Sequence, residues 1–147
     1  MSLPPERSLI IPPLGSLYTS LAPLSELLLR LVAGGFLMIH GIPKFSNLEG
    51  VQGMVESLGF YPGTVWAPLL ASTETIAGLL IAIGLFTRPA AFAAMIVLLV
   101  TVYFHWIFKA EGFAGAEKSL IWAAVMLFLV AHGAGRYSID ANRGKEF

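Results

Sequence analysis

The sequence predicts an all-α integral membrane protein: an up-down bundle of four transmembrane helices, with a short interfacial helix between the first two. Of the 147 residues, 56% are hydrophobic and only 12% are charged, and the mean hydropathy is +0.78. A soluble domain carries about 25% charged residues, so this chain has too little charge to cover a water-exposed surface of its own. Its length fits one domain. A nucleic-acid binder is excluded because no basic stripe is present.

Four continuous apolar stretches are long enough to cross a bilayer as helices. They lack the alternating pattern of barrel strands, which excludes a β-barrel. The short Thr87–Pro89 connection between the second and third stretches makes those helices antiparallel neighbours. The expected spans are residues 24–43, 65–86, 89–108 and 119–134.

The spans divide the chain into three parts. Residues 1–23 contain five prolines and are expected to form an irregular cytoplasmic arm, residues 24–134 the transmembrane domain, and residues 135–147 a cytoplasmic tail. Five Lys and Arg residues fall on the side of the two termini and three on the opposite side. Because positively charged loops stay in the cytoplasm, this distribution favours both termini there.

Residues 46–59 are expected to form the interfacial helix. Ser46 and Glu49 have the spacing of a capping box. Apolar residues then recur at helical spacing on one face, which suits a helix lying along the membrane surface. They are Leu48, Val51, Val55 and Leu58.

Three charged residues lie inside expected spans: Glu26 near the start of the first, Arg30 further into it, and Glu74 near the middle of the second. Arg30 and Glu74 are the two that lie well inside the apolar stretches. A charge in the hydrocarbon costs a few kcal/mol, so each requires a reason. One interpretation is a buried Arg30–Glu74 ion pair that fixes the helix register. The other is a polar site for a proton or a lipid headgroup. The sequence leaves both open.

Two histidines, His40 and His105, are expected near the same membrane boundary. They have the chemistry to ligate haem, but two histidines without a further motif favour ordinary interfacial residues. Aromatic residues at that boundary are typical of an interfacial belt, although they would also suit a pocket for a quinone headgroup. The candidate cofactor-binding residues are therefore Arg30, His40, Glu74 and His105, with quinone as the candidate ligand and no metal site expected.

Three pieces of sequence, taken together and in order on four apolar spans, resemble the DoxX family of small bacterial membrane proteins. This resemblance implies a four-helix protein of the bacterial inner membrane. It also implies a link to quinone-dependent oxidation of sulfur compounds, to membrane oxidoreductase complexes or to redox stress. The pieces are Leu29–Leu31 with His40–Lys44, Glu74–Gly78 with Gly84–Arg88, and Gly135–Asp140.

The sequence has no cysteine, so dithiol chemistry would require a partner subunit. It also shows no recognisable nucleophile setting, so an independent enzyme has no positive support. We therefore expect an accessory subunit of a quinone-linked oxidoreductase, anchored in the lipid bilayer and associated with other membrane subunits or with copies of itself. The alternatives are a purely structural scaffold and, with less support, a small oligomeric carrier.

Overall fold

The structure is a computed structural model that describes residues 10–144, and these residues form helices without any strand. In chain order the elements are α1 (Leu14–Gly41), the 3₁₀ helix η1 (Ile42–Asn47), α2 (Leu48–Ser57), α3 (Gly63–Ser72), the π-helical η2 (Thr73–Ala77), α4 (Gly78–Ile83), α5 (Thr87–Tyr103), the π-helical η3 (Phe104–Phe108), α6 (Gly112–His132) and α7 (Ile139–Arg143).

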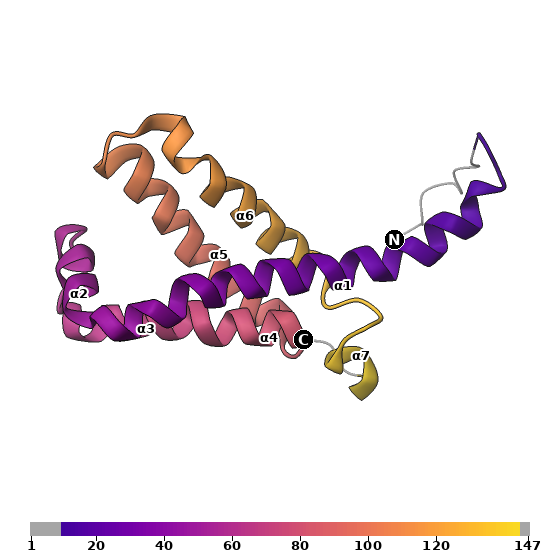
Figure 1. Cartoon of the computed structure of the whole chain (residues 1–147), viewed down its shortest axis with the longest axis horizontal. Coiled ribbons are helices and arrows are strands. Elements are labelled where there is room, and N and C mark those ends of the chain that lie inside the picture. Colours follow the sequence, from indigo (N-terminus) through magenta and orange to yellow (C-terminus); the bar gives the residue numbers. More distant parts are fainter. Residues whose placement is uncertain (1–9, 145–147) are drawn as a thin grey trace, which may run out of the picture.

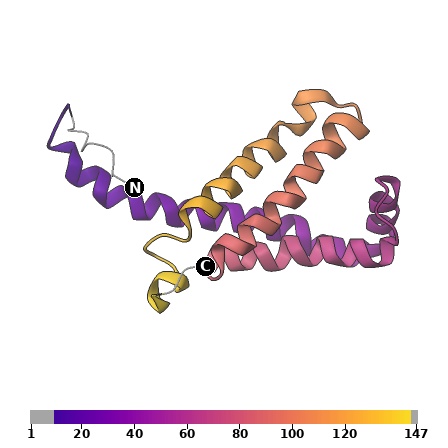
Figure 2. The same ribbon diagram turned by 180° about the vertical axis from the view of Figure 1, so that it is seen from behind.

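The helices form two hairpins (Figure 1). In the first, α1 packs against the rod formed by α3, η2 and α4, and in the second, α5 packs against α6. The hairpins meet where α4 turns into α5, which we call the tail end, and they diverge toward the α2 end, where α2 lies across the first hairpin (Figures 1 and 2). Four helices are long and apolar enough to cross a membrane. The predicted helical membrane bundle is therefore confirmed.

Small residues build the core of the bundle. Helices in lipid gain little from apolar burial, so they associate by close packing, and small side chains allow it. A Cβ on Gly78 would lie 2.7 Å from the Gly34 carbonyl oxygen, so these two glycines bring α1 and α4 together backbone to backbone. The buried apolar residues of this core are Ala33, Leu37, Ala77, Ile81, Ala90, Ala91, Ala94, Met126 and Leu129.

The glycine contacts fix where α1 lies along the bundle. Gly41 lies against Thr75 of η2, and Arg30 lies against Gly84 at the end of α4. The 3₁₀ helix η1 then continues along α3. The part of the first helix that packs within the bundle is therefore residues 30–47, shifted toward the α2 end from the predicted span 24–43. Residues 14–29 extend past the tail end (Figure 2).

The predicted irregular arm is wrong for residues 14–23, which belong to α1. Pro23 stands inside this helix. A proline removes one backbone hydrogen bond, and the helix tolerates that loss because the flanking Leu, Ala and Ser residues keep the remaining bonds. Residues 1–9 lie outside the described part of the chain, as do residues 145–147 of the tail.

The helix predicted after the first span is present as α2, but its N-terminal cap differs from the predicted one. The side chain of Asn47, not Ser46, accepts a hydrogen bond from the Gly50 backbone N–H, because η1 carries the helical turn on to Asn47. Val51 and Val55 are buried against Ala67 of α3 in a second small core. The apolar face of α2 thus covers the end of the first hairpin.

Candidate functional site

A buried ion pair joins the first two spans. Glu74 of η2 is buried and pairs through Oε2 with Nζ of Lys44 in η1. The same Nζ donates a hydrogen bond of 2.9 Å to the backbone carbonyl of His40. Glu74 lies ten residues before Gly84, which places it about 15 Å from the tail end and close to the middle of the bilayer. The site is therefore a charged pair inside the hydrocarbon region.

Gly41 makes this pair possible by its lack of a side chain. A Cβ at Gly41 would lie 2.5 Å from Oγ1 of Thr75 and 2.9 Å from Cβ of Glu74. A larger residue would push α1 away and take Lys44 with it. The Thr75 hydroxyl is buried without a hydrogen-bond partner among the described residues, so a polar atom beside the pair remains available.

Glu74 also lies in an unusual backbone. The segment Thr73–Ala77 is π-helical, inserted between α3 and α4. Such one-turn insertions interrupt the ordinary hydrogen-bond ladder and occur often at functional sites. Sequence reasoning missed this feature because apolar periodicity carries no signal for a single wide turn.

Arg30 takes a different partner from the one expected. It is 1% exposed, and Nη2 donates a hydrogen bond to the Tyr137 carbonyl in the tail. The predicted Arg30–Glu74 pair is thus wrong, because Arg30 lies at the tail end whereas Glu74 lies at mid-bundle. The acidic groups whose charges act on Arg30 are those of Asp140 and Glu26.

Asp140 fastens the tail to the turn between α4 and α5. Its Oδ1 accepts from the Phe86 backbone N–H at 3.0 Å, and its Oδ2 accepts from the Thr87 N–H at 3.1 Å. Its own N–H donates to the Gly84 carbonyl at 2.9 Å. A carboxylate thereby satisfies N–H groups at the start of α5, where the helix dipole also favours a negative charge. Apolar periodicity gives no signal for this role of Asp140, although the tail piece Gly135–Asp140 is part of the family resemblance.

The side chains of the two candidate histidines lie apart from the Lys44–Glu74 pair and from the contacts of Arg30 with the tail. His40 is exposed on α1. His105 lies in η3, with Nδ1 2.6 Å from Oε2 of Glu111 in the loop before α6. The hydrogen bond with His105 holds the pKa of the Glu111 carboxyl below its ordinary value, and the charges of His105 and Lys109 act in the same direction. Among residues 10–144, no group of three or more potential metal ligands lies together.

The four candidate residues therefore do not converge on one point. Glu74 is linked to the His40 backbone through Lys44, whereas Arg30 lies at the tail end and His105 beside the α5–α6 loop. Lys44 is the partner that sequence reasoning missed. The signal that pointed to it was its place in the His40–Lys44 piece, four residues after His40 and therefore one helical turn along.

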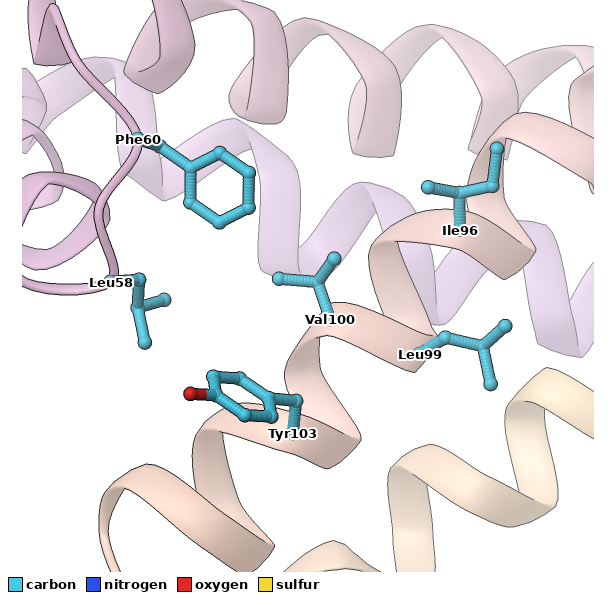
Figure 3. Close-up of a pocket in the computed structure, with 6 residues that line it drawn as sticks. All are labelled: Leu58, Phe60, Ile96, Leu99, Val100 and Tyr103. Carbon is cyan, nitrogen blue, oxygen red and sulfur yellow. The ribbon is translucent and has the colours of Figure 1, made fainter.

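An apolar groove opens between the two hairpins toward the α2 end (Figure 3). Its volume is about 460 Å³. The Tyr103 hydroxyl is the one polar side-chain group among the residues that line it. Ile96 lies nine residues into α5, about 14 Å from the tail end and thus near the depth of Glu74. The lining residues are Leu58, Phe60, Ile96, Leu99, Val100 and Tyr103.

These features define a four-helix membrane protein with an ion pair between buried Glu74 and half-buried Lys44, and with an apolar groove between its hairpins. The DoxX family model matches residues 25–110, which is more than half of the chain. The chain belongs to the DoxX family, as the sequence resemblance indicated. No solved structure matches the chain significantly.

Three curated relatives share the sequence pattern. An uncharacterized membrane protein of Mycobacterium tuberculosis is 29% identical over 84% of this chain and 83% of its own length. An uncharacterized protein of Haemophilus influenzae is 31% identical over 76% of this chain and 85% of its own. A Bacillus subtilis protein named "Putative oxidoreductase CatD" is 35% identical over 44% of this chain and 47% of its own.

Proposed function

We propose that this chain is an accessory, non-catalytic subunit of a quinone-linked membrane oxidoreductase, in which it anchors partner subunits and contributes a quinone or proton site. The observation that carries the proposal is the ion pair of buried Glu74 with half-buried Lys44 in the middle of the second span, together with the apolar groove along α5. An ionisable group within the membrane is a functional candidate by default. An apolar groove that would suit an apolar ligand lies along α5, the helix against which η2 packs.

The groove fits the chemistry of a quinone. Its volume falls within the range of about 300–1,000 Å³ that is typical of small-molecule sites. Phe60 and Tyr103 would lie against a flat ring, and the Tyr103 hydroxyl would donate to a ring carbonyl. The remaining aliphatic walls suit an isoprenoid chain. When bound, a quinone would supply the capacity to accept electrons and protons.

Glu74 would hold the proton at this depth. Proton uptake at Oε2 would weaken its contact with Lys44, whose ammonium group would keep its hydrogen bond to the His40 carbonyl. The η2 segment that carries Glu74 packs against α5, the helix that supplies four of the groove residues. A proton on Glu74 and a ligand in the groove would therefore act on the same helix.

The accessory role is supported by what the chain offers for chemistry. It contains no cysteine, so it provides neither thiolates nor dithiols of its own. The resemblance to the Bacillus subtilis protein covers 65 residues and supports a connection to oxidoreductases for this part of the chain. A partner subunit would then carry the redox reaction.

We further propose that the membrane is the bacterial inner membrane and that both termini are cytoplasmic. Because Lys44 is drawn into the bundle, the described lysines and arginines beyond the α2 end reduce to Lys109 and Lys118. Cytoplasmic loops carry the excess of such residues. At the tail end the corresponding residues are Arg88, Arg136 and Arg143.

Filling the groove tests the quinone site. In Val100→Trp an indole would occupy the space between α5 and Phe60, and we expect quinone copurifying with the protein to fall about tenfold. Phe92→Trp, on an exposed position of the same helix, is the matched control and should retain it. Mass spectrometry after gentle detergent extraction measures bound quinones and subunits together. Wild-type protein without quinone, combined with unchanged quinone reduction after gene deletion, would contradict this part of the proposal.

Replacing Glu74 separates a proton site from a structural one. Glu74→Gln keeps the shape of the side chain and removes its charge, so we expect normal assembly with partner subunits and at least about tenfold slower quinone reduction in membranes. Glu49→Gln, exposed on α2, is the control. Loss of assembly in Glu74→Gln would instead support the scaffold alternative. Metabolite flux into liposomes would support the carrier.

A further inference from the structure

The N-terminal part of α1 extends beyond the rest of the bundle. The helix has 28 residues and is about 42 Å long, whereas the hydrocarbon core of a bilayer is about 30 Å thick. Arg30 lies level with Gly84, where α4 ends. Residues 14–29 therefore continue for about 24 Å past the tail end, where α4 gives way to α5 (Figure 1).

This extension is amphipathic. Leu17, Tyr18, Leu21 and Leu24 recur at helical spacing, and about half of each side chain is exposed. The stripe continues without interruption into Leu28 and Leu31, exposed residues on the side of α1 that faces away from the core. It is thus an extension of the lipid-facing side of the helix.

The opposite face is polar but carries no charge. Ser16 and Thr19 lie there, and Ser20 lies at the edge of the stripe. The hydroxyls of all three hydrogen-bond to backbone carbonyls one turn earlier in the chain. Residues 14–25 contain no Asp, Glu, Lys or Arg. Attraction to anionic headgroups is therefore unavailable to this segment, and any membrane affinity must come from the apolar stripe.

Pro23 stands within this segment and accounts for a bend in the helix. It lies seven residues, or two turns, before Arg30, and so on the face opposite the apolar stripe. A proline ring clashes with the carbonyl of the preceding turn and bends the helix away from its own face. The bend in the N-terminal third of α1 is visible from both sides (Figures 1 and 2).

We propose that residues 14–25 form a surface-bound helix at the tail end, with Leu17, Tyr18, Leu21 and Leu24 inserted between the lipids of that leaflet. Lipid covers these side chains, because they continue the lipid-facing side of α1. Because the polar face is uncharged, binding of the segment depends on the packing of the lipids and not on their charge. This inference does not depend on the proposed function.

The absence of native cysteines allows a direct test with single labelled positions. The full chain carrying Leu21→Cys or the matched control Thr19→Cys is labelled with an environment-sensitive fluorophore and placed in phosphatidylcholine nanodiscs that hold one copy each. We expect iodide quenching to be about threefold weaker at position 21 than at position 19, and quenching by nitroxide lipids to be correspondingly stronger. Equal iodide quenching at both positions would place the segment in water and overturn the proposal.

Two further conditions distinguish other occupants. Protection at position 21 should persist in nanodiscs with one copy and should not change when a third of the lipid is anionic or when salt is raised. Protection from iodide and from nitroxide lipid together would mean that protein covers the stripe. Protection that appears only when several copies share a bilayer would assign it to a second chain. Either result would overturn the assignment to lipid.

Discussion

The variant Gly34→Val is expected to separate α1 from α4 and to lower the free energy of unfolding by about 3 kcal/mol. Any Cβ at position 34 would lie 2.8 Å from the Ala82 backbone nitrogen and closer still to the Gly78 carbonyl oxygen. Backbone atoms cannot move aside as a flexible side chain can. The two helices must therefore move apart. Their alignment also holds Lys44 beside Glu74, so the ion pair would be disturbed as well.

The neighbouring glycine supplies the control for this variant. Nothing lies within 4 Å of a Cβ built on Gly35, so Gly35→Val is expected to leave stability nearly unchanged. Both variants put the same side chain on the same helix, so helix propensity and hydrophobicity cancel in the comparison. Unfolding in mixed micelles with increasing SDS measures the difference. Equal stability of the two variants would mean that α1 does not cross α4 at Gly34.

Removing the Asp140 carboxylate should release the tail from the bundle. Asp140→Ala removes the carboxylate that accepts from the buried Thr87 N–H and from the Phe86 N–H, and removes a negative charge that acts on buried Arg30. Unpaired buried donors cost about 1–3 kcal/mol each, so we expect a loss of about 3 kcal/mol. Proteolysis after the tail arginines should accelerate in parallel, since residues 137–143 would no longer be held.

Asn142→Ala is the control for the tail, because Asn142 is exposed on the same short helix α7. It should leave stability and proteolysis unchanged. Asp140→Asn should fall between the two, since an amide oxygen still accepts one hydrogen bond but carries no charge. Wild-type stability of Asp140→Ala, measured in the same micelles, would show that the tail contributes nothing to holding the α4–α5 turn.

The candidate site could be predicted only in part. Glu74 was identifiable because an ionisable residue in an apolar span requires an explanation, and that argument needs no partner. Lys44 was missed because residue 43 was taken as the end of the first span, which placed Lys44 in a loop. One of the two interpretations paired Arg30 with Glu74, and the structure does not contain that pair. Two opposite charges in neighbouring spans suggest a pair, but the spacing within each span does not say at which depth each charge lies.

The sequence by itself determined that the chain folds in lipid and that four of its helices span the membrane. Long apolar runs with few charges require helices in lipid, since the backbone of each helix satisfies its own hydrogen bonds whatever its neighbours do. The short α4–α5 turn and the helix after the first span also follow from their own residues and do not depend on neighbouring helices. The family membership also follows from residues in linear order.

The tertiary structure decided the register of α1, the partners of its charges and the fate of its N-terminal turns. These depend on the close approach of Gly34 to Gly78 and of Gly41 to Thr75, contacts between separate helices that apolar periodicity does not encode. Sliding α1 by one turn would leave its hydropathy pattern unchanged and would separate Lys44 from Glu74. Amino-acid composition determines which segments form helices in the membrane, whereas backbone contacts between the helices determine the depth of each one.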